Sequence, residues 1–165
     1  MLLPVTDSAR AIENLLYTYA LRIDAGDLDG VADLFAHGRI LGQEDGPPES
    51  VFEGRDGVRA MYEMATRLYD DGTPKTKHVT TNTIIEVDEE AGTASAQSSY
   101  LVTQATADLP LQVIITGHYR DTFQRLVDVD GAASGTGRWW FDTRTMYVDQ
   151  VGDLSHHLRR TRRPR

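Results

Sequence analysis

An aspartate and a histidine are the residues of this sequence best suited to acid–base chemistry. Asp24 follows the last apolar residue of a predicted helix, and His78 lies at the start of a predicted strand. Histidine exchanges a proton near neutral pH without a large change in its pKa, and an aspartate at a buried helix edge needs a partner because burying an unpaired charge is costly. Each also has a plainer interpretation, since Asp24 could cap a turn at Gly26 and a strand histidine is often structural.

Two tyrosines and an asparagine accompany this pair as candidate pocket residues. Tyr17 and Tyr19 lie in the same predicted helix as Asp24, and Tyr19 belongs to the apolar stripe of that helix, so it points inward. Asn82 is expected on the same strand face as His78, because alternate residues of a strand point to the same side. All three are therefore candidates for the wall of a pocket.

The last predicted strand combines aromatic residues with a cation. Alternation predicts that Arg144 shares a face with Trp140. Its guanidinium could hold a ligand anion, pair with a buried carboxylate or form an ion pair on the sheet surface. On the preceding strand His118 shares a face with Arg120, and we expect both to be solvated.

Several common chemistries lack their sequence signatures. The chain has no cysteine, which excludes thiolate nucleophiles, disulfides and Cys-ligated metals. It contains neither a glycine-rich phosphate loop nor a Gly-x-Ser-x-Gly elbow. His37, His156 and His157 lack the spaced partners of a metal site, so we expect no metal, and we expect the adjacent histidines to be solvated.

Composition is typical of one ordinary globular domain. The 165 residues are 40% hydrophobic and 25% charged, with a net charge of −8. Five arginines fall within residues 159–165, and without them acidic residues outnumber basic ones about two to one. Such a surface repels nucleic acid. We find no signal peptide and no membrane-length apolar run, which predicts a cytoplasmic protein that binds neither nucleic acid nor membrane.

The order of the predicted elements indicates an α+β fold. Apolar residues at helical spacing predict three helices near the start of the chain, and segments rich in Thr, Val, Ile and Tyr follow them. Helices followed by antiparallel strands leave one sheet face for the helices to cover. The predicted helices span residues 12–23, 28–35 and 56–68, and the main strands span 79–87, 93–103, 111–127 and 138–148.

Five short runs resemble a known family in their order and spacing. They are Tyr19–Asp29 leading to Leu34-Phe35, Glu53–Gly57, Lys77–Asn82, Gly117–Asp121 and Trp139–Arg144. Together they resemble SnoaL-like proteins of the NTF2-like superfamily. The resemblance implies a cone of three N-terminal helices packed on a strongly curved antiparallel sheet around an apolar pocket. We therefore expect one domain over residues 1–152, followed by a flexible basic tail over residues 153–165.

The resemblance also implies a chemistry. In the dehydratase branch of the family, the reactive group occupies positions that match Tyr19, Asp24 and His78 here, and an arginine on the last strand corresponds to Arg144. Loss of water beside a carbonyl needs a base, an acid and a donor to the enolate oxygen. His78 would be base and then acid, Asp24 would hold its tautomer, and Tyr19 would donate to the carbonyl. This dehydratase or isomerase activity on a small hydrophobic, cyclic hydroxy-carbonyl ligand needs no cofactor.

The resemblance also allows a non-catalytic function, and the apolar strand residues predict a homo-oligomer. The family includes small subunits of ring-hydroxylating oxygenases without a catalytic site, so the chain could instead bind a ligand or support a partner. Five apolar strand residues exceed what one sheet face would use, which predicts a homodimer or homotrimer formed through the sheet. They are Val79, Ile85, Val87, Ile114 and Trp140.

Overall fold

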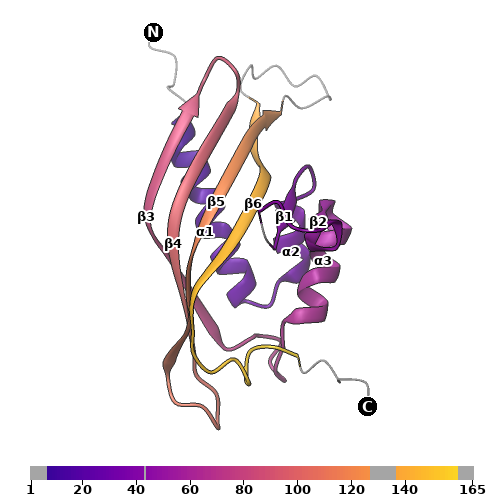
Figure 1. The fold of residues 1–165 in the computed structure, drawn as a ribbon, viewed down its shortest axis with the longest axis vertical. Helices are drawn as coiled ribbons and strands as arrows, with labels where there is room; N and C mark the ends of the chain where they lie inside the picture. The colour runs from indigo at the N-terminus through magenta and orange to yellow at the C-terminus, as the bar shows by residue number, and fades with distance from the viewer. Residues whose placement is uncertain (1–6, 43, 127–136, 160–165) are drawn as a thin grey trace.

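Three helices cover one face of a strongly curled six-stranded sheet, in which the four longest strands wrap along the first helix (Figure 1). The computed structural model describes residues 7–42, 44–126 and 137–159. The helices of this part are α1 (Ser8–Asp24), α2 (Leu28–Asp33) and α3 (Gly54–Ala65), with a short 3-10 turn at Pro48–Ser50. The strands are β1 (Arg39–Leu41), β2 (Val51–Glu53), β3 (Thr76–Asp88), β4 (Thr93–Gln104), β5 (Gln112–Leu126) and β6 (Arg138–Val151).

Helix α1 forms the axis around which the sheet curls. The Asp7 side chain caps it by accepting a hydrogen bond from the Arg10 amide at 3.0 Å. The predicted stripe is buried, including Ile12, Leu16 and Ile23. The helix ends before Gly26, whose φ of +74° favours glycine and whose added Cβ would meet the Gly72 oxygen at 1.9 Å.

The sheet has the order β2-β1-β6-β5-β4-β3 and is mixed rather than wholly antiparallel. Strand β1 runs parallel to β6, with Ile40 opposite Arg144. The expectation of a purely antiparallel sheet is therefore wrong at this one pairing. No tight hairpin turn joins β1 to β6, so nothing local to the sequence imposes an antiparallel direction on them.

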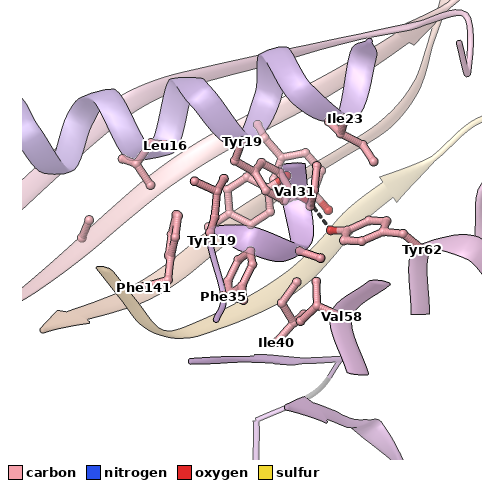
Figure 2. Close-up of a cluster of buried hydrophobic side chains, with 14 of the residues drawn as sticks. Leu16, Tyr19, Ile23, Val31, Phe35, Ile40, Val58, Tyr62, Tyr119 and Phe141 are labelled. Carbon is pink, nitrogen blue, oxygen red and sulfur yellow. Dashed lines mark hydrogen bonds between the residues drawn. The ribbon is translucent and has the colours of Figure 1, made fainter. Parts of the chain in front are cut away.

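The core lies between the helices and the sheet and is rich in aromatic rings. Figure 2 shows Tyr19, Phe35 and Phe141 packed among aliphatic residues from α1, α2 and α3. The Phe35 and Phe141 rings stack with centroids 4.7 Å apart. The interior of the cone is thus filled over this stretch by side chains of the protein itself.

A β-bulge in β3 reverses the alternation that the sequence suggests. The pairing of β3 with β4 shifts between Thr81 and Ile84, and Asn82 has a φ of 53°. Beyond the bulge, Ile85 and Val87 pack against the core instead of facing outward with Val79, which is 46% exposed. A similar shift buries Ile114. Three of the five apolar residues expected on a second face therefore belong to the core.

Helix α3 differs from its predicted bounds at both ends. It begins at Gly54 rather than Asp56, and it ends at Ala65, so Leu68 is not part of its stripe. The reason is that Thr66 turns to an extended conformation and forms an isolated antiparallel bridge with Leu158. In the part of the chain that the structure describes, no helix has the length and apolarity needed to cross a membrane.

Candidate active site

The last residue of α1 and the first residues of β3 meet at one end of the cone. Asp24 lies at the C-terminal end of the helix, where the chain turns away at Gly26. The Gly26 amide donates to the Ile23 carbonyl at 3.0 Å, so Asp24 is not needed as a cap for that turn. Its side chain and that of His78 are 7% and 10% exposed.

Three hydrogen bonds fix the Asp24 carboxylate against β3. The Nδ1 atom of His78 lies 2.6 Å from Oδ1, and the Thr76 hydroxyl donates to the same oxygen at 2.9 Å. The backbone amide of His78 donates to Oδ2 at 2.8 Å. Backbone and ring of one residue are thus held by a single carboxylate, which fixes both the strand end and the imidazole orientation.

The electrostatics of the pair settle which nitrogen carries the proton. Burial alone would raise the pKa of Asp24, but the hydrogen bonds and charge of His78, with the Thr76 hydroxyl, outweigh it and hold that pKa below its usual value. An ionised carboxylate only accepts hydrogen bonds. His78 therefore donates through Nδ1, and in the neutral ring Nε2 keeps the lone pair that a general base needs.

Apolar residues lie in register with His78 across the sheet. Val102, Ile115 and Val151 are its successive cross-strand neighbours on β4, β5 and β6, on the helix-covered face. Val102 is buried, whereas Val151 is 61% exposed. Val148, which lies in the next row on the same face, is 56% exposed. The helix-covered side of the sheet therefore presents exposed apolar surface beyond the end of α1.

The chain after β6 folds back toward this end of the cone. We name residues 153–159 the C-terminal strap. The Arg67 amide donates to the His157 carbonyl, and the Arg159 amide donates to the Ala65 carbonyl, each at 2.9 Å. The described part of the predicted flexible tail is therefore docked, and residues 160–165 lie outside the described part.

The two adjacent histidines of the strap have different surroundings. The His156 ring lies at the edge of an open hollow of about 700 Å³, whereas the Nδ1 atom of His157 is buried without a hydrogen-bond partner among the described residues. The expectation that both are solvated is wrong for His157. Its pKa is lowered to about 4, first by burial and then by the charge of nearby His78.

Tyr19 points into the core, and no hydrogen bond in the described part of the chain joins it to Asp24 or His78. Its hydroxyl lies 2.5 Å from that of Tyr62 (Figure 2). Burial, together with Tyr19, raises the pKa of Tyr62 well above its usual value, so the phenol stays protonated. The hydrogen bond between the two hydroxyl groups joins α1 to α3.

Arg144 is completely buried and paired with a carboxylate, one of the three roles that the sequence allows. Its Nε and Nη2 atoms donate to the two oxygens of Asp121 at 2.8 Å each. Burial alone would lower the pKa of Arg144, but the Asp121 charge outweighs it and raises that pKa. The guanidinium also lies 4.2 Å from the Tyr19 ring centroid and 4.0 Å from that of Tyr119.

Arg144 reaches this position because of a bulge. The pairing of β5 with β6 shifts between Thr122 and Phe123, so Asp142 has no counterpart on β5. Arg144 therefore faces the core with Phe141, and the prediction that it shares a face with Trp140 is wrong. Trp140 instead packs edge-on against His37, with ring centroids 4.6 Å apart.

The structure does not bring the remaining candidates to the Asp24–His78 pair. Tyr17 is exposed on α1 and donates to Glu13 at 2.9 Å. Asn82 is exposed at the bulge of β3 rather than on the face of His78. His118 stacks on Tyr147 with ring centroids 4.6 Å apart, at the partly exposed position expected for it.

Sequence reasoning missed three residues that the structure places at or near functional groups. Thr76 stands two residues before His78, and strand alternation could have placed it on the same face. Asp121 lies directly opposite Arg144 on β5, a pairing that the sequence does not reveal because the bulge between Thr122 and Phe123 shifts the register. His157 carried no signal, since its position depends on how the chain turns after β6.

A profile of the SnoaL-like domain matches residues 5–145. The chain belongs to the SnoaL-like family. The match covers all three helices and five of the six strands in full, together with most of β6. No curated protein matches the sequence.

Solved structures show the same NTF2-like fold. A protein of unknown function from Mycobacterium tuberculosis is 26% identical over 87% of this chain and 77% of that chain, with a TM-score of 0.63. A candidate scytalone dehydratase from Novosphingobium aromaticivorans is 24% identical over 88% and 87%, with a TM-score of 0.64. The β subunit of a candidate aromatic-ring-hydroxylating dioxygenase from the same organism is 20% identical over 91% and 95%, with a TM-score of 0.61. In fold, this SnoaL-like chain therefore resembles both the candidate dehydratase and the dioxygenase β subunit.

Proposed function

We propose that this chain is a cofactor-independent lyase or isomerase, dehydratase-like in its chemistry, that acts by His/Asp acid–base catalysis on a hydrophobic, cyclic hydroxy-carbonyl compound. The observation that carries the proposal is the buried hydrogen bond of 2.6 Å between Asp24 and His78 at one end of the cone. A carboxylate that fixes the tautomer of a histidine leaves the other ring nitrogen as a base near neutral pH.

His78 moves the proton in the proposed reaction. Its Nε2 atom takes the proton from the carbon next to the carbonyl, and the electrons of that C–H bond form the enolate. The enolate then collapses to a carbon–carbon double bond as the bond to the β-hydroxyl group breaks. The departing hydroxide takes the proton back from Nε2, so that the products are an unsaturated carbonyl compound and water.

Asp24 is a positioning residue in this scheme, because it acts through His78. Its ionised carboxylate favours the imidazolium that forms when Nε2 takes the proton. In this scheme Tyr19 donates a hydrogen bond to the carbonyl oxygen of the substrate. Its hydroxyl is positioned by the hydrogen bond with the Tyr62 hydroxyl. Its role is the smaller one, because it supplies a hydrogen bond and carries no proton between substrate atoms.

The apolar character of the ligand is inferred from the surroundings of the pair. Val148 and Val151 expose apolar surface on the same sheet face as His78. A hydrophobic ring would remove this surface from water, which is favourable at about 25 cal/mol per Å² of apolar area. A charged or highly polar ligand would gain nothing from these two residues.

A non-catalytic role is the second candidate function, and the packing of the core favours it. Phe35, Phe141 and the Arg144–Asp121 pair fill the interior next to Tyr19. A protein built to support a partner has no need of a large internal pocket. The β subunit from Novosphingobium aromaticivorans shares the fold, which is compatible with such a role.

A direct assay separates the two candidates. We expect the protein to convert a β-hydroxy-tetralone, a bicyclic β-hydroxy ketone, to naphthol, whose fluorescence reports loss of water. His78→Ala and Asp24→Asn should each lower kcat by about 10²–10⁴-fold, and Tyr19→Phe should lower it less. Combining the first two changes should add little to either alone, since residues that act as a unit fail together.

The pH dependence supplies a further check. Because His78 must be neutral to take a proton, kcat/KM should fall at acid pH. Tyr17→Phe, at an exposed position far along α1, is the matched control and should leave turnover unchanged. Full turnover by the double variant would show that the Asp24–His78 pair does not carry the reaction, whereas no turnover by the native protein across a panel of cyclic hydroxy ketones would favour the non-catalytic role.

A further inference from the structure

The C-terminal strap brings a second imidazole to the Asp24–His78 end of the cone. The strap is held on one side by the end of α3 and on the other side by β4. The antiparallel bridge between Thr66 and Leu158 joins it to the end of α3. On the other side, the Gln104 side chain on β4 donates to the His156 carbonyl at 3.0 Å.

The contact with Gln104 locates the strap relative to the reacting pair. Gln104 is the direct cross-strand partner of Thr76, whose hydroxyl donates to Asp24. His78 lies one row further along the same sheet face, two residues after Thr76. The residue that follows His156 in the strap lies close enough to the pair for the charge of His78 to lower its pKa.

The buried ring nitrogen of His157 is the feature that needs an explanation. Its Nδ1 atom has no hydrogen-bond partner among residues 7–42, 44–126 and 137–159. A buried polar atom without a partner destabilises the fold, and such atoms often mark functional sites. The neighbouring His156 does not show this, because its ring lies within 3.4 Å of the Thr106 hydroxyl.

We propose that His157 is a second catalytic residue of this site and that its Nδ1–H group donates a hydrogen bond to the departing hydroxyl oxygen of the substrate. This inference rests on the proposed function. The substrate oxygen supplies the partner that the buried nitrogen lacks. The bond strengthens as negative charge develops on that oxygen, so it stabilises the transition state more than the bound substrate.

A neutral ring is the suitable donor at this place. The pKa of about 4 keeps the His157 ring uncharged above pH 5. An uncharged donor does not repel the imidazolium that forms at His78 and does not compete with it for the Asp24 carboxylate. The two histidines therefore have different roles: His78 carries the proton, and His157 binds the leaving oxygen.

The test compares His157→Gln with the matched control His156→Gln in the full-length protein. The probes are the β-hydroxy-tetralone for turnover and its product naphthol for binding. We expect His157→Gln to lower kcat by about 10–100-fold, as expected for the loss of one donor to developing charge. His156→Gln should change neither kcat nor the naphthol Kd.

A second measurement does not depend on turnover or on how well the variant folds. In the native protein labelled with ¹⁵N-histidine, the β-hydroxy alcohol made by reducing the carbonyl of the tetralone should shift the ring nitrogen signals of both His78 and His157, because it keeps the β-hydroxyl group that naphthol has lost and cannot form the enolate. Signals of His156 and His118 should stay in place. The ring of His157 should also remain neutral down to pH 5.

The outcomes separate the two proposals. If the native protein converts the tetralone and His157→Gln does so equally well, the role of His157 is wrong and the proposed function stands. If this β-hydroxy alcohol shifts the signals of His78 but not those of His157, the same conclusion follows. If the native protein neither converts the tetralone nor binds naphthol, the proposed function fails and the role of His157 fails with it.

Discussion

His157 and Asp24 make the stability of the protein depend on pH in the same direction. His157 has a folded pKa of about 4 against an ordinary value of 6.5, so the unfolded chain binds more protons between these two values. Stability therefore falls as the pH drops from 6.5 toward 4. The pKa of Asp24 is also lowered, so its contribution is present above its ordinary pKa and is lost as the pH falls through its folded value.

We expect His157→Gln to flatten this dependence. One extra proton taken up on unfolding corresponds to a slope of about 1.4 kcal/mol per pH unit, and the variant removes that proton. Urea unfolding at pH 7, 6 and 5 measures the slope. His156→Gln should keep the native slope, and an unchanged slope in His157→Gln would show that the His157 ring is not buried.

The Arg144–Asp121 pair gives a second prediction at this scale. Replacing Arg144 by Met leaves the completely buried Asp121 carboxylate without its partner, and such losses cost about 3–5 kcal/mol. Urea unfolding should therefore show a large drop for Arg144→Met. Adding Asp121→Leu should restore much of the loss, because the unpaired charge is then gone. Arg120→Met, at the exposed neighbouring position, should have little effect.

Residue types and spacing identify Asp24 and His78, but not all of what surrounds them. The pair is predictable because each lies at the end of a strongly patterned element, where the stripe or the alternation fixes its face. Arg144 is not predictable in the same way. The extra residue at Asp142 moves the side chain of Arg144 to the opposite face of the sheet. The sequence of the run Trp139–Arg144 contains no pattern that predicts this bulge.

Among the elements, the C-terminal strap adds more to the structure than its composition suggests. Leu154 packs against the core, and backbone hydrogen bonds join the strap to Ala65 and Arg67. Truncation after Gly152 should therefore lower the free energy of unfolding by about 2–4 kcal/mol, from lost apolar burial and hydrogen bonds. Thermal unfolding followed by circular dichroism measures this. Truncation after Arg159 is the control and should leave the melting temperature unchanged.

The bulge of β3 is the second testable element. Asn82 has a positive φ, a conformation that asparagine and glycine tolerate and β-branched residues do not. Asn82→Val should cost about 1–2 kcal/mol, and Asn82→Gly should cost little. Equal stability of the two variants in urea would mean that β3 pairs with β4 without the bulge.

Element types and order follow from the sequence, whereas their junctions do not. The stripe of α1 and the β-branched runs of β3 and β4 are long enough for periodicity to be decisive. Bulges, the parallel β1–β6 pairing and the docking of the strap depend on contacts between distant segments. No local pattern encodes those contacts, so the sequence leaves them undetermined.

At the scale of the whole molecule, the outer face of the sheet carries exposed apolar side chains. Val79 and Ile84 on β3 and Val113 on β5 are all exposed there. We propose that this face joins two copies of the chain, and light scattering at micromolar concentration should give a dimer. Ile84→Lys should shift the mass to that of a monomer. Leu21→Lys, on the exposed side of α1, should leave the dimer intact.

The parallel pairing of β1 with β6 also determines when the fold can close during synthesis. Arg39–Leu41 must wait for Arg144 and its neighbours, which leave the ribosome about one hundred residues later. Until then Ile40, fully buried in the finished protein, has only the short strand β2 beside it, and the edge of β1 that pairs with β6 stays open. A nascent chain that has emerged only as far as β5 therefore exposes apolar surface from its N-terminal third, and it should depend on chaperones that recognise such surface.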